Sequence, residues 1–250
     1  METPPHPQLP PSQLGVLREG WRMLRRHPLL SLGLLALAVL LGQLGPVLEL
    51  AARTGGSPGA QLLFAFVSLL PLEIYALPLF LARLDAELIG DPANPREGWR
   101  PGFESRWLRV FGAKLLVVSM GAVGCVLILP GLLTFLFFGW APLRVLLRGE
   151  RLVDALRWSG RAMLRCWPRI VQAVLAIALV WLAGQLLMRG VLAGMLPRSG
   201  DEIPDAATRL RHPAFWIAGG LAGLVHLWSS AAFLALYQRL ERLAQSSEIR

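Results

Sequence analysis

The hydrophobic positions of this 250-residue chain fall into six long apolar blocks that are separated by shorter polar stretches. An α-helix rises about 1.5 Å per residue, so roughly 20 apolar residues can cross the hydrocarbon core of a bilayer. We therefore predict an all-α polytopic membrane protein with one membrane domain over residues 13–240. The predicted transmembrane helices cover residues of about 28–50, 60–84, 107–129, 132–147, 169–188 and 213–240.

The composition agrees with this pattern. Hydrophobic residues make up 54% of the chain and charged residues only 16%, whereas soluble domains carry about a quarter charged residues. This excludes a soluble enzyme. The two ends read differently: residues 1–12 form a proline-rich segment that we expect to be a flexible tail, and residues 241–250 form a polar tail.

Two basic amphipathic segments lie beside the predicted spans. The first covers about Gln13–His27 and the second Arg148–Pro168. In each segment, leucines and tryptophans recur at helical spacing while arginines lie largely off the apolar stripe, a pattern typical of helices at a membrane interface. The arginines that we expect to contact anionic lipid or a partner are Arg18, Arg22 and Arg25 in the first segment and Arg157, Arg161 and Arg165 in the second.

The distribution of charge predicts the orientation. The chain has 25 basic and 16 acidic residues, for a net charge of +9. With six spans both termini lie on one side, and most of the basic residues fall in or beside the loops on that side. Because cytoplasmic loops are enriched in Arg and Lys, we predict that both termini and both amphipathic helices are cytoplasmic.

A short similarity within the chain leaves the arrangement of the spans open. Residues 23–28 (MLRRHP) precede the first span and residues 163–168 (MLRCWP) precede the fifth. One interpretation is a set of three in-out-in helical hairpins, each entered through an Arg-rich segment. The alternative is that spans entered from the cytoplasm commonly carry Arg and Trp at that point.

Three acidic or basic residues lie at least seven residues inside predicted spans. Glu73 lies near the middle of the second span, between Pro71 and Pro78, and His226 lies at a similar depth in the sixth. A charged group at this depth costs about 2.5–3.5 kcal/mol on insertion scales, so these residues are candidates for a proton or cation site, a headgroup contact, or a hydrogen-bonded structural pair. Lys114, about seven residues into the third span, is expected to extend its side chain to the interface.

Small residues in the sixth span predict close helix packing. Gly219 and Gly223 have the small-xxx-small spacing that lets helices approach each other, and they share a face with His226. The same pattern is compatible with dimerisation, although packing within the chain is the expected role.

The region from Pro130 to Arg169 resembles a known family. A Leu-Pro-Gly turn, a span ending in basic residues, and an Ala-Leu…Ser helix with arginines running into the next span are similar to six-span bacterial inner-membrane proteins related to the membrane domain of glycerophosphodiester phosphodiesterases. The resemblance implies an all-helical module in the bacterial inner (plasma) membrane and carries no catalytic residue. The matching residues are Leu129, Pro130, Gly131, Ala155, Leu156, Ser159, Arg161 and Arg165.

No catalytic motif is visible in the sequence. HExxH and Walker A patterns are absent, and the four histidines have no zinc-ligand spacing. We therefore expect no enzymatic activity, no cofactor, no metal and no nucleic-acid binding. The predicted partners are the lipid bilayer, its anionic phospholipids and a membrane protein.

Two functions remain from these observations. The first is a non-enzymatic inner-membrane module that contacts anionic lipid or a membrane partner through its Arg-rich cytoplasmic segments. The alternative is a small transporter or lipid-handling protein in which Glu73, with or without His226, is a protonatable centre. Glu73 favours the second function, while the scarcity of polar residues in the first, third, fourth and fifth spans favours the first.

Overall fold

The computed structural model describes residues 13–52, 71–88, 103–125, 129–195 and 206–248, together with residues 59, 63–64 and 67–68. Within these residues every element of regular structure is a helix, as the sequence predicts. The elements are α1 (Gln13–Arg26), α2 (Pro28–Ala52), η1 (Leu72–Ala76), α4 (Leu77–Leu88), α5 (Phe103–Cys125), α6 (Leu129–Phe138), α7 (Ala141–Arg148), α8 (Leu152–Met195), α9 (Ala206–Arg211) and α10 (Pro213–Glu248). The predicted N-terminal tail, residues 1–12, lies outside the described residues, whereas α10 continues through residues 241–248 of the predicted polar C-terminal tail.

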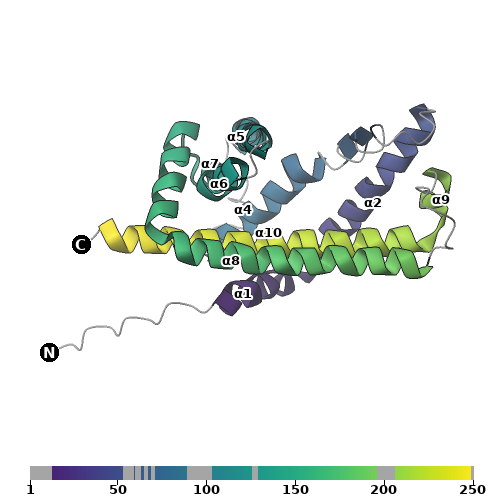
Figure 1. Ribbon diagram of the computed structural model, residues 1–250. Coiled ribbons are helices and arrows are strands. Elements are labelled where there is room, and N and C mark those ends of the chain that lie inside the picture. The colour runs from purple at the N-terminus through teal and green to yellow at the C-terminus, as the bar shows by residue number, and fades with distance from the viewer. Residues whose placement is uncertain are drawn as a thin grey trace.

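Three of the described helices are long and apolar enough to cross a membrane: α2, α8 and α10. They correspond to the first, fifth and sixth predicted spans. The long part of α8 runs beside α10, and the connection between them, which includes α9, lies at one end of this pair (Figure 1). Both helices expose large apolar side chains; Leu179 and Leu186 are 65% and 59% exposed. Such surfaces suit contact with lipid rather than water.

The hydrophobic core surrounds the C-terminal half of α10. Tyr237 and Leu234 are fully buried there, and they pack in one cluster with Met23 of α1, Phe80 of α4 and Val145 of α7. Gly20 of α1 lies directly against the backbone of Ala232, with no room for a larger residue. The apolar face of α1 is therefore covered by α10.

The predicted fourth span is interrupted in the structure. The expected helix over residues 132–147 is divided into α6 and α7 by a turn at Gly139 and Trp140. Pro142 follows in the first turn of α7, where its missing N–H is tolerated, so a new helix begins here. Each piece is too short to span a bilayer alone.

The predicted fifth span continues the preceding amphipathic segment. Residues Leu152–Met195 form one helical stretch with a kink at Cys166, whose φ of −123° and ψ of 17° are not helical. Pro168 lies two residues later and cannot donate to the helical ladder, which accounts for the break. Figure 1 shows the part of α8 before the kink turned sharply away from the long α8–α10 pair.

Helix α5 lies across the α8–α10 pair rather than parallel to it (Figure 1). Figure 1 views α5 almost along its axis, while α8 and α10 lie across the view. Helix α5 packs mainly on α6 and α7. The structure therefore establishes an all-helical chain with three candidate membrane-spanning helices, and the six-span topology stays a prediction.

Candidate functional site

Glu73 lies in a wide helical turn. Residues Leu72–Ala76 form the π-helix η1, in which the Leu77 N–H donates to the Leu72 carbonyl. The next donor in this register would be residue 78, which is a proline without an N–H, so the Glu73 carbonyl has no backbone donor from that position. π-Helical turns are frequent at functional sites.

Two basic residues from other helices meet Glu73. The Lys114 ammonium donates to the free Glu73 carbonyl over 2.9 Å and to Glu73 Oε2 over 3.0 Å. His226 Nε2 lies 2.6 Å from Glu73 Oε1, although its N–H is not aligned for a hydrogen bond. We call Glu73, Lys114 and His226 the intramembrane triad, after the position that the sequence predicts for them.

The triad brings together the three intramembrane residues singled out from the sequence. The sequence places Glu73 and His226 at a similar depth, and the structure brings their side chains into contact. Lys114 was expected to extend to the interface, but in the structure its ammonium binds Glu73. The Glu73 carbonyl and carboxylate provide two acceptors within hydrogen-bond distance. The side chains of all three residues are about one-third exposed, at 36%, 33% and 36% for Glu73, Lys114 and His226.

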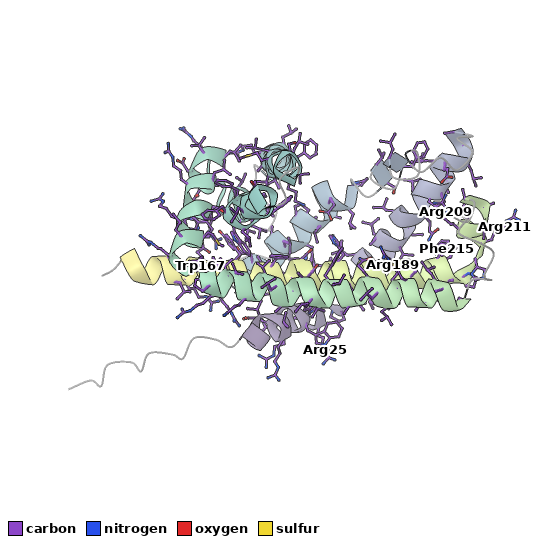
Figure 2. The ribbon with its side chains drawn as sticks, in the orientation of Figure 1. Arg25, Trp167, Arg189, Arg209, Arg211 and Phe215 are labelled. Atoms are coloured by element: carbon purple, nitrogen blue, oxygen red, sulfur yellow. The ribbon has the colours of Figure 1, made fainter. Side chains whose placement is uncertain are left out.

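The arginines of the second amphipathic segment form an exposed face on the first part of α8. Arg157, Arg161 and Arg165 follow at four-residue steps and are exposed. Beside them on the same helix, Val153, Leu164 and Trp167 are 56%, 67% and 57% exposed. Figure 2 shows Trp167 where this part of α8 meets the long pair. The opposite face is buried, and the Ser159 hydroxyl there donates to the Phe137 carbonyl of α6. We call the exposed residues the α8 interfacial face.

The arginines of the first segment are also exposed. Arg18, Arg22 and Arg25 lie on the side of α1 opposite to Met23 and Leu24, which are buried in the core. The Arg25 guanidinium lies 5.2 Å from the centre of the Trp21 ring, a cation–π distance. Arg25 points away from the rest of the chain (Figure 2).

A second charge network, which the sequence analysis did not identify, joins α4, α7 and α10. Arg148 donates to Glu241 Oε1 over 2.7 Å and to Asp85 Oδ2 over 2.9 Å. Asp85 also accepts from Gln238 over 2.9 Å, and Arg144 reaches Glu241 over 2.5 Å. Hydrogen bonding to Glu241 raises the pKa of Arg148 above its usual value, while burial opposes this effect. We call these five residues the basal clamp.

Aromatic residues cover the basal clamp on the side of α8. The Arg144 guanidinium lies 4.7 Å from the centre of the Trp158 ring, and Trp158 packs on Tyr237 with ring centres 5.5 Å apart. The four-residue spacing of Arg144 and Arg148, and of Tyr237 and Glu241, was visible in the sequence. The charge pattern indicated only the membrane orientation of these arginines, so their ion pairs with Glu241 and Asp85 were not predicted.

A further ion pair ties α2 to α9. Glu49, which is 4% exposed, accepts a hydrogen bond from Arg209. Arg209 and Arg211 lie at the end of the molecule where α8 connects to α10 (Figure 2). This pair holds the end of α2 beside the α8–α10 connection.

The two glycines of the sixth span lie in different surroundings. A Cβ atom on Gly223 would meet Leu35 and Ala38 of α2 at 3.0 and 3.4 Å, so α2 packs closely there. At Gly219 a Cβ atom would meet no atom within 4 Å. Close packing therefore involves Gly223 within the chain, and the space beside Gly219 is open.

The described residues contain no group of three His, Cys, Asp or Glu side chains that could hold a metal ion. No family model, no curated protein and no solved structure was found to match the chain. The fold and the two clusters thus define the protein only as a helical chain with three helices that are able to cross a membrane.

Proposed function

We propose that this chain is a non-enzymatic integral protein of a bacterial inner membrane, and that the α8 interfacial face binds anionic lipid headgroups. One observation carries the proposal: exposed arginines and exposed apolar side chains lie side by side on a helix that bends at Cys166 away from a segment long and apolar enough to cross a membrane. A helix in this position can place Leu164 and Trp167 at the acyl boundary and its guanidinium groups among the phosphates.

The charge of the face supports the same function. A basic residue near an anionic surface contributes about 1 kcal/mol of attraction, so three arginines are sufficient for preferential retention of anionic lipid. Asp154 is the one acidic neighbour on this turn, and it lies 3.9 Å from Arg157 with both side chains mostly exposed. Its screening of Arg157 is therefore weak.

Native mass spectrometry of the protein released from nanodiscs tests this proposal. Nanodiscs of phosphatidylcholine with one-fifth phosphatidylglycerol are compared for the wild type, for Arg157→Gln/Arg161→Gln/Arg165→Gln, and for the control Arg189→Gln/Arg211→Gln. The control removes exposed arginines far from the α8 face. The triple variant is expected to retain at least tenfold less phosphatidylglycerol than the control. Equal retention in all three proteins contradicts lipid binding by this face and points to a protein partner.

A second candidate function is favoured by the contact between Glu73 and His226. A carboxylate and an imidazole 2.6 Å apart inside a membrane protein can exchange a proton, as expected of a small transporter or lipid-handling protein. Proton flux into proteoliposomes, followed with an enclosed pH dye, is expected to fall at least tenfold in Glu73→Gln and to be unchanged in Asp154→Asn. A wild-type flux equal to that of empty liposomes contradicts this candidate.

A further inference from the structure

The intramembrane triad has hydrogen-bond donors left over and few acceptors. Both carboxylate oxygens of Glu73 and its carbonyl oxygen face basic groups at 2.6–3.0 Å. Lys114 has three N–H donors, two of which are accounted for by Glu73. The N–H of His226 at Nε2 is not aligned with any acceptor among the described residues. A molecule that binds here must therefore bring acceptor oxygens.

The balance of charge favours the same kind of molecule. The triad contains two basic side chains and one carboxylate. Three acidic side chains on the helices around the triad are engaged elsewhere: Glu49 of α2 pairs with Arg209, and Asp85 of α4 and Glu241 of α10 pair with Arg148. An oxyanion at the triad would therefore meet two basic side chains and a single carboxylate.

The triad is accessible from an apolar surrounding. Its side chains are about one-third exposed, and Leu115, next to Lys114, is 54% exposed. Gly219 lies two helical turns before His226 on the same face of α10, and the space beside it is open. His226 is thirteen residues from the start of α10, about 20 Å along its axis, so the triad is far from the end of this span. A ligand at this depth must have an apolar part.

We propose that the intramembrane triad binds the oxyanion headgroup of an amphiphile, a phosphate or carboxylate, with the apolar chain lying along α10 beside Gly219. The Lys114 ammonium donates to the headgroup oxygens, and Glu73, which also contacts His226, holds Lys114 in place. This proposal rests on the second candidate function and names its ligand class. It is separate from the α8 interfacial face, which contacts lipid at the membrane surface.

The test uses phosphatidic acid as the probe, at one-twentieth of the lipid in phosphatidylcholine nanodiscs. Native mass spectrometry compares the wild type with Glu73→Gln/Lys114→Gln, which removes one charge of each sign and leaves no unpaired charge behind. Arg211→Gln, which removes an exposed arginine outside both the α8 interfacial face and the triad, is the matched control. The proposal expects at least a tenfold loss of bound phosphatidic acid in the double variant and less than a twofold change in the control. If the double variant fails to insert, His226→Gln is used, with an expected loss of about threefold.

Three results would overturn the proposal. They are equal retention in the wild type and the triad variants, an equally large loss in Arg211→Gln, and binding of inorganic phosphate that displaces phosphatidic acid, which would make the ligand a free anion. Raising the salt concentration separates the two sites further, because surface binding is screened strongly and a site within the membrane much less. Retained phosphatidic acid with no proton flux would reject the second candidate function and leave the binding site in place.

Discussion

Arg148 and Glu241 form a two-point contact across 93 positions of sequence. The Arg148 Nε donates to Oε1 of Glu241 over 2.7 Å, and Nη2 of the same guanidinium donates to Oε2. This parallel arrangement is the strongest geometry for an arginine and a carboxylate. It fixes the end of α7 on the end of α10, next to Asp85 of α4.

Removal of Arg148 is expected to destabilise the protein by about 2 kcal/mol. Breaking a buried ion pair costs about 3–5 kcal/mol because a buried charge is left unpaired, and the 26% exposure of Arg148 reduces this figure. The Arg148→Met variant leaves both Asp85 and Glu241 without this partner. Thermal unfolding in detergent micelles measures the effect, with Arg151→Met, an exposed neighbour, as the control. A melting temperature equal to that of the control would show that the contact adds no stability.

The close approach of α1 to α10 makes Gly20→Ala a destabilising change. A Cβ atom on Gly20 would lie 2.8 and 2.9 Å from the backbone N and Cα of Ala232, and neither atom is part of a flexible side chain. Overpacking of this kind costs about 1–3 kcal/mol. In contrast, Gly33→Ala is expected to stabilise α2 by roughly 0.5–1 kcal/mol, because no atom lies within 4 Å of the new Cβ position. Opposite shifts in melting temperature confirm the prediction, and equal shifts contradict the packing of α1.

The pair Glu49–Arg209 is expected to show an asymmetry between single and double substitution. Glu49→Gln leaves Arg209 charged while its side chain is only 16% exposed, so we expect a loss of about 2 kcal/mol. Glu49→Gln/Arg209→Gln removes both charges and should cost less than either single change. Chemical or thermal unfolding of the three variants measures the coupling. Additive losses would mean that the two residues act independently.

The two ends of the α8–α10 pair are expected to lie on opposite sides of the membrane. Arg161 lies before the kink of α8, and Arg211 lies in the connection to α10; both are exposed. After replacement of Cys125 and Cys166 by serine, Arg161→Cys should react with an impermeant maleimide from the cytoplasmic side and Arg211→Cys from the other. Labelling of both from one side would contradict the spanning orientation of α8 and α10.

Local sequence rules predicted the start of two of the three candidate membrane-spanning helices, α2 and α10. Pro28 and Pro213 begin α2 and α10 as expected, because proline is tolerated where a helix has no donor to satisfy. The break between α6 and α7 at Gly139 and Trp140 was not predicted. The apolar sequence continues through these residues, and hydrophobicity alone does not indicate where a helix ends and the next one begins.

The site was predicted in its residues but not in its geometry. The depth of a residue follows from the number of residues between it and the ends of its span, and this number predicted a similar depth for Glu73 and His226. Their contact also depends on the rotation of each helix about its axis, which is set by packing such as that of Gly223 on Leu35. The pairing with Lys114 depends in addition on the wide turn at η1, which a single-sequence pattern does not reveal.

The bond from Lys114 to the Glu73 carbonyl has a consequence for how the site would respond to protons. A main-chain oxygen carries no titratable proton, so this anchor is the same whether the carboxylate is charged or neutral. Proton uptake by Glu73 would weaken one of the two contacts of Lys114 and leave the other intact. The triad can therefore change its charge while Lys114 still holds α5 on η1. Protonation of the carboxylate and the packing of these two helices are thus independent of each other.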